Sequence, residues 1–170
     1  AQRVQQSLLP DSAPVVDGFE IAGRSLYCDE TGGDYIDYLP EEHGLGVVVG
    51  DVSGHGIAAA LLMATARALL RMRTRSQGSP AQYVADLNRL LSLDVRQSGN
   101  FVTLFYLFLD PLERTLTWVR AGHEPALRFS PHSGEFERLM GEGLALGVLD
   151  EFDFTQYTTT PLEPGEIVLV

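Results

Sequence analysis

The stretch that most constrains this chain is residues 47–64, VVVGDVSGHGIAAALLMA. Three valines lead into a glycine and one acid, Asp51, and no further Asp, Glu, Lys or Arg comes before Arg67. A short β-branched run followed by a glycine-rich turn and an uncharged helical segment predicts a buried strand, a turn and a buried helix. Asp51, at the end of such a strand, is therefore the residue whose presence most needs an explanation.

Hydrophobic periodicity divides the chain into strands, then two long helices, then more strands. At the start we expect a helix over 1–9, ended by Pro10, and strands over 19–27, 32–39 and 45–52. The long helices are expected over 55–75 and 80–96, the second capped by Ser79 with Pro80 at its first position. Later strands are expected over 101–110, 114–122, 126–130, 136–140, 154–160 and 166–170. Because strands and helices are segregated, the order favours an α+β fold with antiparallel sheets and a central strand at 101–110.

The first long helix is predicted to be buried on more than one side, because the first half of it lacks charge. One of its faces comprises Ile57, Leu61, Ala64, Ala68 and Met72, and another Leu62, Ala66 and Leu69. The second long helix is amphipathic. We expect four of its side chains to face the core, namely Val84, Leu87, Leu90 and Leu91.

Charge and cysteine content exclude several classes of protein. The 170 residues include 12 basic and 23 acidic ones, a formal net charge of −11, which argues against nucleic acid as a partner. The charge is compatible with binding of divalent cations or a basic partner, and equally with an ordinary acidic surface. The single cysteine, Cys28, permits no internal disulfide and suits the cytoplasm. The uncharged run over 56–66 is too short to span a bilayer and no signal peptide opens the chain, so we expect no membrane association.

Two acids are predicted to meet at the end of a hairpin. If the hairpin formed by 32–52 has its midpoint between Glu42 and His43, paired residue numbers sum to 85 and Asp34 lies opposite Asp51. Side chains in such a pair stand about 4.5–5.5 Å apart at Cβ, so two carboxylates repel unless a cation lies between them. The same face would carry the apolar residues Ile36, Tyr38, Val47 and Val49. The pair therefore predicts a cation site at one end of an apolar face.

The neighbouring residues extend this hypothesis and also offer an alternative to it. An all-oxygen donor set favours Mg²⁺ or Mn²⁺ over zinc, and nearby glycines leave the Val52 carbonyl free to act as a ligand. The first amides of the following helix would favour a phosphate nearby. Asp37 has the opposite parity, and we interpret it as a solvated acid on the other face or, at most, a supporting residue. The alternative is that Asp51 and Ser53 only cap the helix, since both residue types commonly do so.

Six short motifs occur along the chain in a specific order: QQSLLP, GGDYID, DVSGHGIAAALLMA, FVTLFYLFLD, AGHEP and LALGV. Together they resemble the bacterial PPM-type (protein phosphatase 2C-like) serine phosphatases of the sporulation and stress-response regulator group, over nearly the whole chain. The resemblance implies an α/β/β/α sandwich, in which two packed antiparallel sheets are flanked by helices. It also implies hydrolysis of protein phosphoserine or phosphothreonine with two Mn²⁺ or Mg²⁺ ions and no phosphoenzyme.

The resemblance assigns roles residue by residue. Asp51 would bridge both metal ions, Val52 would supply a carbonyl ligand, and Asp34 would be a further ligand or hold the water. The implied substrate is a phosphorylated anti-sigma-factor antagonist. Residues 1–10 would end a helix that connects an upstream sensor or receiver domain and supports a homodimer, and residues 11–170 would form the phosphatase-like domain of a cytoplasmic protein.

The resemblance also implies a Thr-Asp-Gly turn and a later acid beyond Val170, so we expect the 170 residues alone to have little or no activity. The competing hypothesis is a phosphatase-like adaptor that binds a partner without turnover. Further carboxylates after Val170 would favour catalysis, and their absence would favour the adaptor.

Several other polar residues have two interpretations each. His55 is either a proton donor or phosphate contact, or a plain turn residue, and His123 is interpreted as a structural turn residue. Asn88 is expected to pack or cap, whereas Arg24 and Arg120 are surface charges that could meet a phosphate. We assign the aromatic residues, Trp118 among them, to the core.

Overall fold

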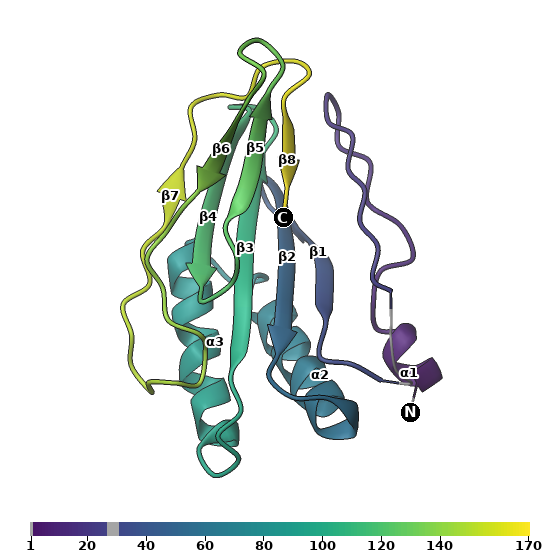
Figure 1. The fold of residues 1–170 in the computed structure, drawn as a ribbon, viewed down its shortest axis with the longest axis vertical. Coiled ribbons are helices and arrows are strands. Elements are labelled where there is room, and N and C mark those ends of the chain that lie inside the picture. Colours follow the sequence, from purple (N-terminus) through teal and green to yellow (C-terminus); the bar gives the residue numbers. More distant parts are fainter. Residues whose placement is uncertain (1, 27–30) are drawn as a thin grey trace.

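The chain forms two antiparallel sheets and a helical layer in residues 2–26 and 31–170, the parts that the computed structural model describes (Figure 1). The helices are α1 (Gln2–Gln6), α2 (Gly56–Arg73) and α3 (Pro80–Val95). The strands are β1 (Tyr35–Glu41), β2 (Gly44–Val52), β3 (Val102–Asp110), β4 (Thr115–Ala121), β5 (Ala126–Ser130), β6 (Glu135–Leu139), β7 (Tyr157–Thr158) and β8 (Ile167–Leu169). The larger sheet has the order β1-β2-β3-β4-β7 and the smaller one β6-β5-β8, which confirms the predicted α+β class.

Strand β3 lies at the centre of the larger sheet, as its apolar run predicts. Its side chains alternate between two cores because successive residues of a strand point to opposite faces. Leu104 and Tyr106 belong to the core beneath the helices, whereas Phe105 and Leu107 belong to the core shared with the smaller sheet. We call the face that carries Phe105 and Leu107 the inner face of the larger sheet.

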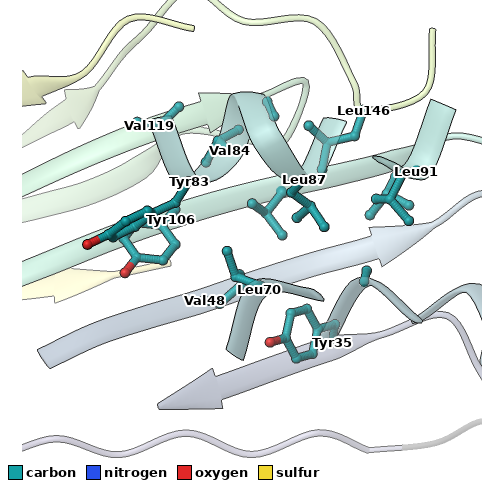
Figure 2. Packing of buried hydrophobic residues seen from close by; sticks show 14 of the residues in the cluster. Tyr35, Val48, Leu70, Tyr83, Val84, Leu87, Leu91, Tyr106, Val119 and Leu146 are labelled. Carbon is teal, nitrogen blue, oxygen red and sulfur yellow. The ribbon is translucent and has the colours of Figure 1, made fainter. Parts of the chain in front are cut away.

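Helices α2 and α3 cover the opposite face of the larger sheet and pack against each other (Figure 1). Figure 2 shows Leu70 of α2 and Leu87 of α3 in the cluster that also includes Val48 of β2 and Tyr106 of β3. These two helices are one of the predicted outer layers. A helical layer on the outer side of the smaller sheet stays a prediction.

Helix α2 packs against the sheet and α3, but the predicted buried face that carries Ile57, Leu61 and Met72 is open to solvent. Its buried residues are Ala59, Met63, Ala66 and Leu70. By contrast, Ile57, Leu61 and Met72 are 64%, 65% and 61% exposed. The buried residues recur at a helical period and face β1 and β2, and among the described residues no second layer covers the other side.

Helix α3 begins as predicted. The Ser79 hydroxyl accepts a hydrogen bond from the Gln82 amide, and the Gln82 side chain accepts one from the Ser79 amide, which forms a capping box. Val84, Leu87 and Leu91 face the core, but Leu90 is 40% exposed, contrary to prediction.

Residues 19–26 do not form the predicted strand, and residue 27 lies outside the described residues. They make one isolated bridge, between Val16 and Phe19. A Cβ at Gly23 would lie 2.5 Å from the Tyr38 hydroxyl and 2.6 Å from Ile36 Cδ1, so the segment packs on side chains of β1 rather than pairing with its edge. The predicted strands over 154–160 and 166–170 are reduced to β7 and β8. No helix in the described ranges has the length and apolar character needed to cross a membrane.

Candidate metal centre

The β1–β2 hairpin has the predicted register. Tyr35 pairs with Gly50, so paired numbers sum to 85. Beyond this pair, the Val52 amide donates a hydrogen bond to the Gly33 carbonyl at 3.3 Å, so the same register continues past Asp34 and Asp51. The two acids are thus opposite each other. They lie at one end of the inner face, to which Val47 also belongs.

The two carboxylates interact electrostatically. Partial burial raises the pKa of Asp51, the negative charge of Asp34 raises it further, and His123 opposes both effects. Both acids are exposed to solvent. A pair of like charges on one face that solvent reaches is a suitable place for a cation, which would remove the repulsion.

Gly33 brings the backbone of the first strand close to Val52. A Cβ at position 33 would lie 2.6 Å from the Val52 carbonyl oxygen and 3.0 Å from the Val52 amide nitrogen. Real Cβ atoms do not approach backbone atoms this closely, so a larger residue would push the two segments apart. Glycine at this position therefore lets the segment that carries Asp34 lie directly against the Val52 backbone.

The turn after Asp51 is not a side-chain-capped helix start. Helix α2 has His55 as its N-cap residue, and the His55 side chain makes no capping hydrogen bond. The Ser53 hydroxyl instead accepts a hydrogen bond from the Phe101 amide at 2.9 Å. Gly54 and Gly56 take φ values of 91° and 75°, which favour glycine. The alternative in which Asp51 and Ser53 serve only to cap the helix is therefore wrong.

His123, interpreted from the sequence as a structural turn residue, lies at the same end of the inner face. Its Nδ1 is 2.8 Å from the hydroxyl of Thr103, and Thr103 is paired with Asp51 in the β2–β3 ladder. The proximity of Thr103, His123 and Asp51 was not predicted from the sequence. One feature of the sequence could have predicted it. The AGHEP motif directly follows the strand expected over 114–122, which is the neighbour along the chain of the expected central strand over 101–110.

The arginine and histidine candidates lie in different settings. Arg120 donates from Nη1 to the His123 carbonyl and from Nε to the Gly141 carbonyl, both at 2.8 Å, so its guanidinium holds loops together. His55 and Arg24 are exposed.

Asp37 lies on the helix-covered face, as its parity predicts, but the interpretation of a solvated acid is wrong. Its carboxylate is fully buried and accepts hydrogen bonds from Arg71 Nε at 2.6 Å, the Tyr35 hydroxyl at 3.0 Å and the Tyr38 amide at 2.9 Å. Arg67 lies 3.7 Å away. Asp37 therefore fastens α2 to β1 and is structural.

The donor set fits Mg²⁺ or Mn²⁺ in chemistry, since it consists of carboxylate and carbonyl oxygens. It is small in number. In residues 2–26 and 31–170 no group of three or more His, Cys, Asp or Glu side chains is placed to hold a metal ion. The described residues thus bring together two carboxylates and one carbonyl, fewer oxygen donors than a single Mg²⁺ or Mn²⁺ ion takes.

Comparison with known sequences finds a family and several bacterial relatives. Residues 41–170 match the family described as Stage II sporulation protein E (SpoIIE). The chain is 29% identical over 170 residues to phosphoserine phosphatase RsbU of Bacillus subtilis (strain 168), covering all of this chain and 50% of RsbU. It is 28% identical over 174 residues to phosphoserine phosphatase RsbP of the same organism, covering 99% of this chain and 42% of RsbP. The chain thus spans about half the length of the curated relatives that it matches.

Solved structures with the same fold include two from bacteria. The RsbU and RsbW domains of Rv1364c from Mycobacterium tuberculosis superimpose with a TM-score of 0.71 at 25% identity, covering 84% of this chain and 40% of that one. The SiaA-PP2C domain of Pseudomonas aeruginosa gives a TM-score of 0.76 at 20% identity, covering 98% and 66%. At 20% identity, the similarity to the SiaA-PP2C domain shows a shared fold and nothing more. The two packed antiparallel sheets expected from the sequence are thus the PP2C fold.

Proposed function

We propose, from the premise that this chain belongs to the Stage II sporulation protein E family, that it is the metal-dependent phosphatase domain of a bacterial signalling protein. Its substrate would be phosphoserine or phosphothreonine on a regulatory partner. The proposal rests on one observation above all, the hairpin register that sets Asp34 opposite Asp51 on a face open to solvent. The relatives RsbU and RsbP, both named phosphoserine phosphatases, support the same activity.

Three residues of this chain would hold the metal ions. Asp51 would bridge two Mn²⁺ or Mg²⁺ ions, with Asp34 and the Val52 carbonyl as further oxygen ligands. When bound, such ions lower the pKa of water and neutralise phosphoryl oxygens. In the reaction, a water oxygen forms a bond to phosphorus while the bond from phosphorus to the serine or threonine oxygen breaks. The displaced oxygen ends with a proton, and inorganic phosphate leaves.

The partner and the regulation are part of the proposal. The substrate would be the phosphorylated form of an anti-sigma-factor antagonist, and the setting would be the cytoplasm. Residues 1–10 would end a connector from an upstream sensor or receiver domain and contribute to a homodimer. One contact supports a link between the connector and the site. The Gln5 side chain is 5% exposed and donates to the Gly32 carbonyl, in the segment that leads to Asp34.

A second candidate function is an adaptor that binds a partner without turnover. It is favoured by the small number of ligands that the described residues bring together. For the same reason we expect the 170 residues alone to hydrolyse phosphate esters weakly or not at all.

The deciding experiment is phosphate release from an aryl phosphate, with and without Mn²⁺, by the 170-residue chain and by the natural full-length protein. We expect turnover by the full-length protein with Mn²⁺, and a loss of about 100-fold or more in Asp51→Asn. Asp94→Asn, which changes an exposed acid on α3, is the matched control and should be unaffected. Full activity in Asp51→Asn would defeat the assignment. No turnover of either the aryl ester or a phosphorylated partner would favour the adaptor.

A further inference from the structure

Thr103 lies between the main chain of Asp51 and the ring of His123. It lies on the inner face of β3, directly paired with Asp51. Its hydroxyl oxygen is 3.4 Å from the Asp51 carbonyl oxygen and 2.8 Å from His123 Nδ1. Both Thr103 and His123 are half-buried. The metal-ligand roles proposed for Asp34, Asp51 and Val52 do not account for this contact.

The backbone of His123 is held by the surrounding loops. Arg120 donates to the His123 carbonyl at 2.8 Å, and the Gly122 amide donates to the Gly143 carbonyl at 3.2 Å. Gly122 has a φ of 67°, and a Cβ there would lie 2.8 Å from the Ala145 amide nitrogen, so only glycine fits. With its backbone fixed in this way and Nδ1 in contact with Thr103, the imidazole has a defined position beside Asp51.

The contact between Thr103 and His123 fits either tautomer of the ring, and the second contact of Thr103, with the Asp51 carbonyl, favours one of them. A hydroxyl group has one hydrogen to donate. If Thr103 donates it to the Asp51 carbonyl, its oxygen can only accept the hydrogen of His123 Nδ1. The neutral ring then has no proton on Nε2, which is left as an acceptor. The hydrogen bonds of the described residues include none to Nε2.

The charge state of the ring is compatible with this tautomer. Burial lowers the pKa of His123, and Arg120 lowers it further, while Asp51 and Glu124 act in the opposite direction. The net effect is a lowered pKa, so the imidazole is neutral at neutral pH.

We propose that His123 is a further catalytic residue, whose Nε2 accepts a hydrogen bond from the water that attacks phosphorus, and that Thr103 is the positioning residue that fixes its tautomer. This inference rests on the proposed phosphatase function. A fixed acceptor beside the acid pair would orient the water so that a lone pair faces the phosphorus atom, which is the kind of positioning that lowers a reaction barrier.

Kinetics of the natural full-length protein with Mn²⁺ test the proposal. His123→Asn keeps an amide nitrogen near the place of Nδ1 but lacks Nε2, and Thr103→Val removes the hydroxyl at nearly constant shape. We expect each to lower kcat by roughly 10- to 100-fold, with KM and the Mn²⁺ dissociation constant unchanged. Thr103→Ser should restore kcat. The matched control is Thr117→Val on β4, where the hydroxyl contacts Thr158 at 2.9 Å, and it should leave kcat unchanged.

Two outcomes would overturn this inference while leaving the proposed function intact. One is wild-type kcat in His123→Asn, which would make the ring merely structural. The other is weakened Mn²⁺ binding at unchanged kcat, which would place His123 in the metal centre. Inactivity of the wild-type protein would instead overturn the proposed function, and the catalytic role of His123 with it.

The tautomer can be measured independently of activity. Nitrogen-15 NMR of the histidine side chains at neutral pH should show the His123 proton on Nδ1, and this preference should disappear in Thr103→Val. A proton on Nε2 in the wild-type protein would overturn the assignment whatever the kinetics show.

Discussion

At the scale of single residues, the acid pair that we propose for metal binding lowers the stability of the metal-free protein. Asp34 and Asp51 lie opposite each other, and the raised pKa of Asp51 reflects both partial burial and their repulsion. A raised folded-state pKa of an acid means that its stability penalty is absent at low pH. The penalty develops as the pH rises from the unfolded-state pKa through the higher folded-state pKa, because over that range the unfolded state has released its proton while the folded state still holds it.

Asp34→Asn should therefore stabilise the metal-free protein. With EDTA at pH 7 we expect a gain of about 0.5 kcal/mol in the free energy of unfolding, small because both groups are exposed to solvent. The gain should vanish at acid pH, where Asp51 is protonated, and Mn²⁺ should no longer stabilise the variant. Urea unfolding at both pH values measures this, with Asp94→Asn as the control. A loss of stability at pH 7 would show that Asp34 has a structural role.

The contrast between Asp51 and Asp37 shows how far sequence reasoning reaches. The hairpin register is local and set by a short tip, so counting from Glu42 and His43 was enough to bring Asp34 and Asp51 together. The partner of Asp37, Arg71, lies 34 positions along the chain, on a helix. Parity predicted the face on which Asp37 lies. It could not predict the rotation of α2 that brings the arginine there.

At the scale of elements, α2 shows what apolar composition leaves undecided. Two apolar faces at the helical period were expected, and neither of them included Ala59 or Met63. The face with Ala59, Met63 and Ala66 packs on the sheet, where the small alanines allow a close approach to β1 and β2. Hydrophobicity alone ranks the other face, with Ile57 and Leu61, at least as high. The shape of the sheet surface determines which face of α2 packs on it, and that shape cannot be predicted from the sequence of α2.

Two truncations on α2 separate these faces. Met63 is fully buried, so Met63→Ala should lower the free energy of unfolding by about 2–4 kcal/mol. Leu61 is 65% exposed, and Leu61→Ala should change it by less than about 0.5 kcal/mol. Urea unfolding of the two variants is a matched comparison on one helix. Equal losses would mean that α2 is covered on both sides in the natural protein, as the sequence led us to expect.

At the scale of the whole molecule, residues 146–150 join the helical layer to the sheet. Leu146 exchanges backbone hydrogen bonds with Val102 at 2.8 and 3.0 Å. Asn88 on α3 is 2% exposed, donates to the Leu149 carbonyl at 2.9 Å and accepts from the Gly147 amide at 2.9 Å. The sequence suggested packing or capping for Asn88. The hydrogen-bond partners of Asn88 lie in the loop over 146–150. The sequence of that loop has no hydrophobic periodicity from which its path could be predicted.

Asn88→Ala should weaken this connection. We expect a loss of about 2 kcal/mol in the free energy of unfolding, because buried carbonyl and amide groups lose their partners. Amide hydrogen exchange of residues 146–150 should become faster. The control is Arg96→Ala, which breaks an exposed ion pair with Asp150 and should cost less than about 1 kcal/mol. Unchanged exchange in Asn88→Ala would show that the segment is held without the asparagine.

The hairpin register also limits how the length of this chain can change during evolution. One residue inserted within β1 or β2 would turn one of the two carboxylates to the face covered by α2 and α3. A residue added between the exposed Glu42 and His43 would leave every pair in place. Among descendants that keep the acid pair, gains and losses of residues should therefore collect at this tip, and the distance along each strand from the tip to its acid should stay constant.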